Sequence, residues 1–344
     1  MGRIGITTTV PVEIIIAAGQ VPVDLNNLFI TDPAAVRLVE AAEDAGYPRN
    51  ICGWIKGLYS VVVPPEENAG SGDTTRIVDR VIAVTQGDCS NTHALMETLQ
   101  MAGVETLPFA YPYDRDTDLL RLQMDKMIGA LGTNWQRVLA VKEQLDGLRS
   151  RVAEVDRLTW QENTVDGWHN HYFQVCCSDF NGDAAAFDEE VTAFLETARG
   201  AAEFTEDLRL GYIGVPPIFT DIYPYLENNG ARVVFNEVQR QFAMPFAVPA
   251  EPGPCTVEQY VDQYRSYTYP YGVFGRIDDI RREMERRNLD GLIHYVQSFC
   301  FRQIEDMIFQ EKLDIPILTI EGDRPGRLDA RTKLRIDSFL EMLR

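Results

Sequence analysis

The stretch Arg80–Ala110, RVIAVTQGDCSNTHALMETLQMAGVETLPFA, decides the fold class of this chain. Residues 80–84 contain a continuous apolar run, which predicts a buried strand. Residues 91–101 predict a helix capped by Gly103, and residues 106–110 predict a second strand. This strand–helix–strand order is typical of a parallel sheet. The polar turn before the helix contains a lone cysteine, Cys89.

The same alternation of short apolar runs and amphipathic stretches returns at both ends of the chain. Further strands are predicted at 4–7, 21–25, 209–213, 231–235, 291–296 and 315–320. Further helices are predicted at 12–18, 219–228, 277–288, 302–312 and 331–343. We therefore expect an α/β protein with two flavodoxin-like (Rossmann-like) parallel-sheet domains.

The middle of the chain has a different pattern. Apolar residues between 138 and 155 recur every three or four positions, which predicts one face of a helix, and residues 119–131 have similar spacing. These helices either link the two sheet domains or pack only on the first sheet. We place the N-terminal domain with its helical linker at 1–165 and the C-terminal domain at 166–344. The glycine-containing stretch 64–72 predicts a loop.

Composition excludes several classes of partner. The 344 residues have a formal net charge of −20, which disfavours nucleic acid and anionic membranes. No apolar run approaches the roughly 20 residues of a membrane span. There is no basic segment followed by a small-residue cleavage site, so we expect a cytoplasmic protein with reduced thiols.

Three cysteines lie at positions where a ligand site can form. Cys89 and Cys300 each follow a predicted strand, and ligands collect beyond the carboxyl ends of parallel strands. Cys52 precedes another predicted helix, and the positive end of a helix favours the thiolate form of a cysteine. Thiolates are the ligands of iron–sulfur clusters.

Simpler interpretations compete with this one. A lone cysteine is most often a small buried hydrophobe, and no CxxC motif supports a zinc or ferredoxin site. Glu13 is a catalytic candidate, although a carboxylate in a first helical turn ordinarily matches the helix dipole. Two histidines, His169 and His171, lack nearby carboxylates and are more often structural. The chain has no Walker A sequence and no G-x-G-x-x-G after a strand.

Three segments together resemble the 2-hydroxyacyl-CoA dehydratase and benzoyl-CoA reductase superfamily. Residues 10–22, VPVEIIIAAGQVP, are similar to the family's P-x-E-x-x-x-A-A-G-x-x-P opening. The second segment is Gly87-Asp88-Cys89. The third is the C-terminal region, where Gly291-Leu292-Ile293, Phe299-Cys300, Ile315–Leu318, Glu321–Asp323 and Arg335–Glu341 occur in the family's order. The resemblance spans nearly the whole chain and is weak between residues 114 and 208.

The resemblance implies a 4Fe-4S cluster between two flavodoxin-like domains. Carried over by position, its ligands are Cys52, Cys89 and Cys300, and Glu13 matches the family's glutamate near the site. It also implies an ATP-dependent iron–sulfur activator that injects one low-potential electron. In the dehydratases that electron makes a ketyl radical anion of a thioester, which then expels the neighbouring hydroxyl. An acyl-CoA substrate and a dimer, with itself or with a related subunit, follow from the same resemblance.

Other functions stay open. The superfamily contains reductases of small molecules with a double-cubane 8Fe cluster, for which Cys176, Cys177 and Cys255 could supply further thiolates. A cluster-bearing electron-transfer subunit of a larger complex and a metal-free binding module are the remaining alternatives.

Overall fold

The computed structural model describes residues 1–64, 76–205, 208–244 and 254–344 of the chain. The chain forms two compact units, each made of three segments. Unit 1 contains Met1–Asp146, Ser178–Ala184 and Phe246–Tyr271, and unit 2 contains Gly147–Cys177, Ala185–Pro245 and Gly272–Arg344. The domain boundary at residue 165 stays a prediction, and the loop predicted at 64–72 lies outside the described residues from position 65 onward.

Unit 1 contains a four-stranded, all-parallel sheet. Its strands are β1 (Arg3–Ile6), β2 (Val21–Asp24), β3 (Arg80–Gln86) and β4 (Glu105–Ala110), in the spatial order β2-β1-β3-β4. Strand β3 is fully buried from Val81 to Val84, as its continuous apolar sequence predicts. The order 2-1-3-4 is that of a flavodoxin-like sheet.

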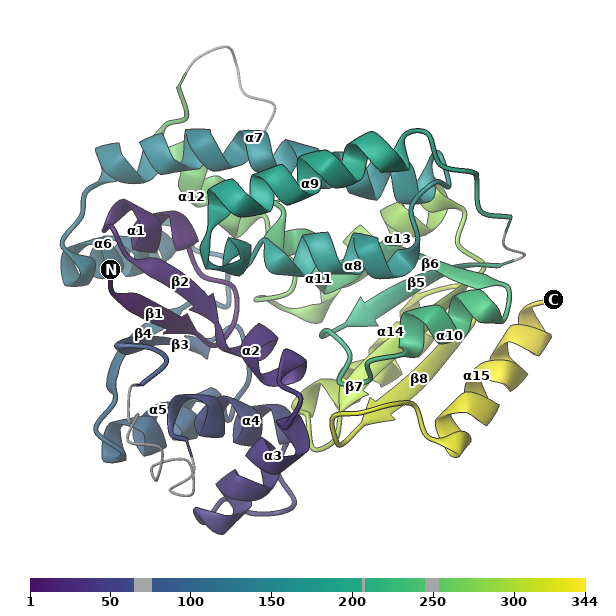
Figure 1. Ribbon diagram of the computed structural model, residues 1–344, viewed down its shortest axis with the longest axis horizontal. Helices are drawn as coiled ribbons and strands as arrows, with labels where there is room; N and C mark the ends of the chain where they lie inside the picture. Colours follow the sequence, from purple (N-terminus) through teal and green to yellow (C-terminus); the bar gives the residue numbers. More distant parts are fainter. Residues whose placement is uncertain (65–75, 206–207, 245–253) are drawn as a thin grey trace. The chain divides into compact units, whose positions relative to one another are not determined.

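The helices of unit 1 follow the strands of this sheet. They are α1 (Val12–Ala17), α2 (Leu25–Thr31), α3 (Ala35–Asp44), α4 (Gly53–Val62), α5 (Thr92–Met101), α6 (Thr117–Leu131), η2 (Phe180–Gly182) and α12 (Val257–Arg265). Figure 1 shows α1 and α6 on one side of the sheet and α4 and α5 on the other. Helix α6 begins where Asp116 accepts a hydrogen bond from the Leu119 amide and ends at Gly132, whose φ is 70°.

Unit 2 repeats this sheet arrangement. Its strands are β5 (Leu208–Gly214), β6 (Ala231–Asn236), β7 (Gly291–Gln297) and β8 (Ile317–Gly322), all parallel, in the spatial order β6-β5-β7-β8. Its helices are α8 (Gly167–Cys176), α9 (Ala184–Ala198), α10 (Ile222–Asn228), α11 (Glu237–Phe242), α13 (Val273–Arg287), η3 (Phe301–Ile304), α14 (Glu305–Lys312) and α15 (Ala330–Leu343). The α/β fold with two parallel sheets is therefore confirmed.

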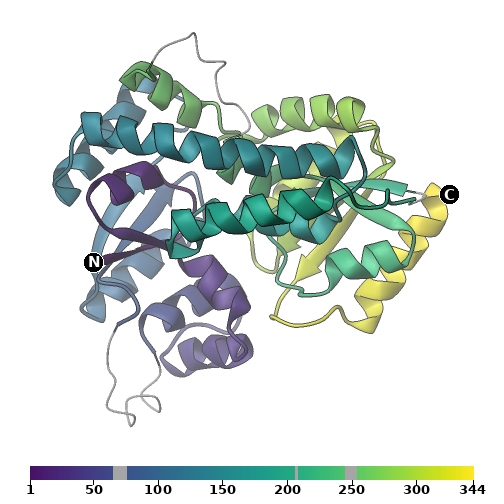
Figure 2. The same ribbon diagram turned by 45° about the horizontal axis from the view of Figure 1, so that its top comes forward.

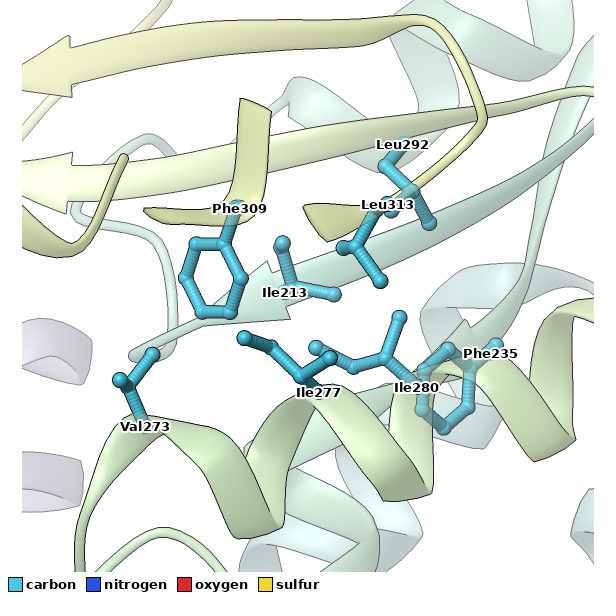
Figure 3. Packing of buried hydrophobic residues seen from close by; sticks show 8 residues of the cluster. All are labelled: Ile213, Phe235, Val273, Ile277, Ile280, Leu292, Phe309 and Leu313. Atoms are coloured by element: carbon cyan, nitrogen blue, oxygen red, sulfur yellow. The ribbon is translucent and has the colours of Figure 1, made fainter. Parts of the chain in front are cut away.

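Helices cover both faces of the second sheet. On one face, α13 and α14 pack against strand residues in a cluster that Figure 3 shows in close-up: Ile213, Phe235, Val273, Ile277, Ile280, Leu292, Phe309 and Leu313. On the other face, the ring of Tyr212 lies 5.8 Å from that of Tyr223 on α10, and a Cβ at Gly291 would lie 2.9 Å from Phe339 of α15. Burial on both faces explains why β5 and β7 are apolar runs rather than alternating ones.

The predicted central helices are both present. Helix α6 lies within unit 1, whereas the long helix α7 (Trp135–Trp160) begins in unit 1 and ends in unit 2. Figure 2 shows α7 as one continuous helix. Helix α7 thus matches the expectation of a linking helix, and α6 matches the alternative of packing on the first sheet. Among the described residues, no helix is long and apolar enough to cross a membrane.

Candidate functional site

Two candidate residues of unit 1, Glu13 and Cys89, lie in segments that follow strands at the carboxyl edge of the first sheet. The strand order reverses between β1 and β3, and ligands of open α/β sheets bind at this reversal. The turn after β1 leads into α1, which bears Glu13, and the turn after β3 contains Gly87, Asp88 and Cys89. Glu13 and Cys89 therefore follow the two strands that flank the reversal, Glu13 on the helix after β1 and Cys89 in the turn after β3.

Gly87 allows a close approach of two segments at this edge. Its φ is 98°, a conformation that favours glycine. A Cβ at this position would lie 2.8 Å from the carbonyl oxygen of Pro270 and 2.9 Å from Cβ of Tyr111. The segment near Pro270 and the end of β4 therefore pack directly against the turn that bears Cys89.

Cys89 lies where backbone N–H groups point toward it. The amide of Asn91 donates to Sγ of Cys89 at 3.3 Å, and the amide of Thr92 donates to its carbonyl oxygen at 3.1 Å. The side chain is half-buried, directly before α5. A donor aimed at the sulfur favours the thiolate, which is the form that binds metal.

Cys52 is the N-cap residue of α4, a ten-residue helix. It is 6% exposed, so its sulfur lies under the protein surface. The first-turn amides and the dipole of this helix favour negative charge at its start. Cys52 thus occupies the helix-start position that its sequence predicts.

Glu13 is a completely buried carboxylate in the first turn of α1. Tyr260 and Tyr264 donate hydrogen bonds to its Oε2 at 2.8 and 2.7 Å. The two tyrosines are four residues apart on α12, so they lie on one face of that helix. Hydrogen bonds from two phenols favour the ionised form of this carboxyl group, whereas complete burial opposes it.

Further tyrosines surround the same edge of unit 1. The hydroxyl of Tyr111 donates to the Thr9 carbonyl at 3.1 Å, and burial raises the pKa of this phenol well above its ordinary value. The ring of Tyr271 lies 5.8 Å from that of Tyr111, and the Arg115 guanidinium lies 4.8 Å from the Tyr271 ring. Burial also raises the pKa of Tyr271.

Sequence reasoning missed this group of tyrosines. The sequence does contain a local enrichment of tyrosine, at positions 260, 264, 267, 269 and 271. Nothing in the local pattern indicates that two of these side chains bind Glu13, since the partners are separated by about 250 residues in sequence.

Unit 2 places Cys300 at the corresponding edge of its own sheet. The strand order reverses between β5 and β7, and Cys300 follows β7 as the N-cap of η3. The preceding residue, Phe299, has a φ of 64°, and the Cys300 amide donates to the Gln297 carbonyl at 3.0 Å. Cys89 and Cys300 thus follow the third strand of their respective sheets.

A buried ion network supports the segment after Cys300. Arg276 on α13 donates through Nε and Nη2 to the two carboxylate oxygens of Glu237 at 2.7 and 2.8 Å, and it also pairs with Glu305. Arg302 binds the same Glu305 at 3.2 Å. Burial raises the pKa of Glu237, but the charge of Arg276 and its hydrogen bonds outweigh burial and the net shift is downward. The network therefore fixes η3 and α14 to the buried start of α11.

The remaining cysteines and the histidine pair have structural surroundings. Cys176 and Cys177 are buried at the end of α8, and burial raises the pKa of the half-buried Cys255 thiol, which disfavours a thiolate. The expectation that these histidines lack nearby carboxylates is wrong, because His169 Nδ1 bonds to Asp166 Oδ2 at 2.6 Å. The His171 ring lies 4.8 Å from that of Tyr223 at a tilted angle. Residues two apart on a helix do not share a face, so this pair is not arranged as a metal site.

The three predicted thiol ligands are divided between the two units. Cys52 and Cys89 belong to unit 1, and Cys300 belongs to unit 2. Within the described part of the chain, no group of three or more His, Cys, Asp or Glu side chains is arranged to hold a metal ion. The assignment of Cys52, Cys89 and Cys300 as cluster ligands therefore stays a prediction.

These features define a class of protein: an α/β chain with two flavodoxin-like sheets and a cysteine after the third strand of each. A sequence model described as 2-hydroxyglutaryl-CoA dehydratase, D-component, matches residues 7–343. The chain therefore belongs to the 2-hydroxyglutaryl-CoA dehydratase D-component family, which confirms the resemblance to the dehydratase superfamily. A comparison with curated proteins finds no match.

Proposed function

We propose that this chain is the iron–sulfur component of an enzyme of the 2-hydroxyacyl-CoA dehydratase type. One observation carries the proposal: Cys89 and Cys300 follow the third strands of two sheets with the same strand order. Ligand sites of such sheets lie at this edge. Membership in a dehydratase D-component family supports the same function.

In this proposal Cys52, Cys89 and Cys300 hold a 4Fe-4S cluster. The donor chemistry fits, because soft thiolates are the ligands of such clusters. The Asn91 amide near Cys89 Sγ and the helix start at Cys52 both favour thiolates. When bound, the cluster supplies one-electron chemistry at low potential and an iron without a protein thiolate, which can polarise an oxygen of the substrate.

Glu13 is the proposed catalytic residue of the chain itself. Its complete burial excludes bulk water, and the donors Tyr260 and Tyr264 hold the carboxylate in one orientation. A carboxylate fixed in this way can position a substrate group or accept its proton.

The proposed partners follow from the same assignment. An ATP-dependent iron–sulfur activator delivers the electron, an acyl-CoA is the substrate, and the chain forms a dimer with itself or with a related subunit. The proposed location is the cytoplasm. Nucleic acid and membranes are not proposed as partners, given the net charge of −20.

Two alternatives remain within the same family of chemistry. A double-cubane 8Fe cluster would make the chain a reductase of a small molecule and would need further thiolates such as Cys255. The charge of −20 favours a second alternative, a cluster-bearing electron-transfer subunit that docks to a basic partner.

Iron and acid-labile sulfide, measured per chain after anaerobic purification, test the proposal together with the visible spectrum. We expect about four irons, lost in Cys89→Ser and in Cys300→Ser but retained in Cys255→Ser. About eight irons, with loss in Cys255→Ser, would favour the double-cubane alternative. A colourless protein that takes up neither iron nor sulfide on reconstitution would rule out the cluster and leave a metal-free binding module.

If the cluster is present, an activity assay with activator, ATP and a 2-hydroxyacyl-CoA separates the enzyme from the electron-transfer subunit. We expect water loss from the substrate that depends on the activator, and a large drop in turnover for Glu13→Gln with iron content unchanged. A loaded protein that passes electrons to a second chain but binds no acyl-CoA would support the electron-transfer alternative.

A further inference from the structure

Three neighbouring elements of unit 2, α8, β6 and α11, carry buried polar atoms that have no hydrogen-bond partner among the described residues. On α8 these atoms are Asn170 Oδ1, His171 Nδ1 and Gln174 Oε1; from β6 into α11 they are Asn236 Nδ2 and both Gln239 amide atoms. None of the five side chains is more than 6% exposed, and Gln239 is completely buried. Bulk water therefore does not reach these groups.

The elements that bear these side chains pack against one another. Helix α8 packs against both α11 and β6. At the start of α8, a Cβ on Gly167 would lie 2.9 Å from the carbonyl oxygen of Val233 in β6. The His171 ring lies 4.8 Å from the ring of Tyr223, and the Tyr223 hydroxyl donates to Asn236 Oδ1 at 2.8 Å.

Existing hydrogen bonds fix which atoms are donors and which are acceptors. The amide nitrogens of Asn170 and Gln174 each donate to Asp156 Oδ1 at 3.0 Å. An ionised carboxylate only accepts, so the amide carbonyl oxygens remain as acceptors. Asp156 is ionised, because the opposing charge of Arg287 outweighs the effect of burial and lowers the net pKa of the carboxyl group.

The other side supplies the complementary groups. The hydroxyl of Tyr223 donates a hydrogen bond to Asn236 Oδ1, so the Asn236 amide nitrogen is the remaining donor. Gln239 offers a donor and an acceptor. Burial lowers the pKa of His171 to about 3, so its ring is neutral at physiological pH. The region therefore presents uncharged donors and acceptors together.

Water is the ligand that fits this set. Leaving several buried amide atoms unsatisfied would consume much of a protein's narrow stability margin. A buried water makes about three hydrogen bonds as both donor and acceptor, so about two waters would satisfy these atoms. We propose that the α8–α11 interface of unit 2 is a binding site for ordered water molecules that bridge Asn170, Gln174, Asn236 and Gln239.

The substitution Gln239→Met tests the proposal through the sign of its effect. If water bridges the amide, methionine removes bonds and leaves the facing groups unsatisfied, so the thermal unfolding midpoint of the full chain falls. If the region is dry, methionine replaces an unsatisfied amide and the midpoint rises. Gln310→Met, at an exposed position of α14, is the matched control and should change little.

A high-resolution crystal structure of the unaltered chain gives an independent readout and stays available if Gln239→Met does not fold. We expect ordered water within hydrogen-bond distance of the Gln239 amide. His171→Phe is a second variant at the edge of the region, and its thermal unfolding midpoint should also fall if water binds there. A raised midpoint in either variant, or an empty or organic-molecule-filled interface in the crystal, would overturn the proposal.

Discussion

The hydroxyl of Tyr264 donates a 2.7 Å hydrogen bond to Oε2 of Glu13, across 251 residues of sequence. Tyr260 donates to the same oxygen at 2.8 Å, and all three groups are buried within unit 1. Helix α12 begins at a capping box between Thr256 and Gln259 and presents two phenols to Glu13 at the start of α1. The orientation of Glu13 depends on a segment far from it in the chain.

Removing one of these phenols should weaken unit 1 through Glu13. We expect Tyr264→Phe to lower the free energy of unfolding by about 1–3 kcal/mol, since it deprives a buried carboxyl oxygen of a donor. In a Glu13→Gln background the same change should cost less, because the hydrogen bond no longer involves a charge. Urea denaturation of the unaltered chain, the two single variants and the double variant gives the coupling energy between Tyr264 and Glu13. Tyr113→Phe, at an exposed tyrosine, is the control, and additive effects of Tyr264→Phe and Glu13→Gln would contradict the interpretation.

A second long-range contact in unit 1 predicts a dependence on pH. The Asp24 amide donates to Asp179 Oδ2 at 2.7 Å, and the two carboxyl groups are both buried. Burial and the charge of the nearby Asp24 raise the pKa of Asp179 to about 7, against the opposing effects of backbone hydrogen bonds from Asp24 and Asn181 and of the Arg3 charge. The folded state therefore binds a proton that the unfolded state loses near its ordinary pKa of about 3.9.

The sign of the effect follows from this raised pKa. The contribution of Asp179 to stability should be fully present below about pH 4 and be lost as the pH rises toward 7, by up to a few kcal/mol. Asp179→Asn should remove this component. The measurement is the free energy of unfolding of the unaltered chain and of Asp179→Asn between pH 4.5 and 8, which spans most of the predicted change. Parallel pH profiles for the two proteins would show that Asp179 is not the titrating group.

The strands and helix starts that position the candidate cysteines could be predicted from the sequence, whereas helix α11 could not. Hydrophobic runs and helix caps are local signals, so the strands that precede Cys89 and Cys300 were predictable. The start of α4 after Cys52 was predictable for the same reason. Helix α11 was not, because all six of its residues are buried and it has no amphipathic face.

The long-range partners of Glu13 and Asp24 are not indicated by the local sequence. The tyrosine donors to Glu13 and the pairing of Asp24 with Asp179 join segments that are distant in sequence. Such pairs are decided by how elements pack, and one sequence does not specify them through periodicity or composition. The candidate cysteines were therefore found from sequence, whereas the groups that support Glu13 were not.

In unit 2, the ion pair between Arg276 and Glu237 should be costly to break. Both side chains are completely buried, and Arg276→Met leaves the Glu237 carboxylate without its main compensating charge. We expect a loss of about 3–5 kcal/mol in unfolding free energy. Arg282→Met removes an arginine that is 66% exposed from an ion pair with Asp279 and should cost less than about 1 kcal/mol. Comparable losses in the two variants, measured by urea denaturation, would contradict the predicted effect of burial.

The turn that bears Cys89 should tolerate no side chain at Gly87. Alanine there would adopt a φ of 98° and place its Cβ 2.8 Å from the Pro270 carbonyl, so the turn or the 270 segment has to shift. We expect Gly87→Ala to cost about 1–3 kcal/mol and to increase hydrogen exchange of the amides at Asn91 and Thr92, which bond to Cys89. Gly129→Ala is the matched control: its Cβ meets nothing within 4 Å on α6, and helix propensity predicts a gain of up to about 1 kcal/mol. Equal stability of the two variants, with unchanged exchange at Asn91, would mean that the close approach at Gly87 does not hold the cysteine turn in place.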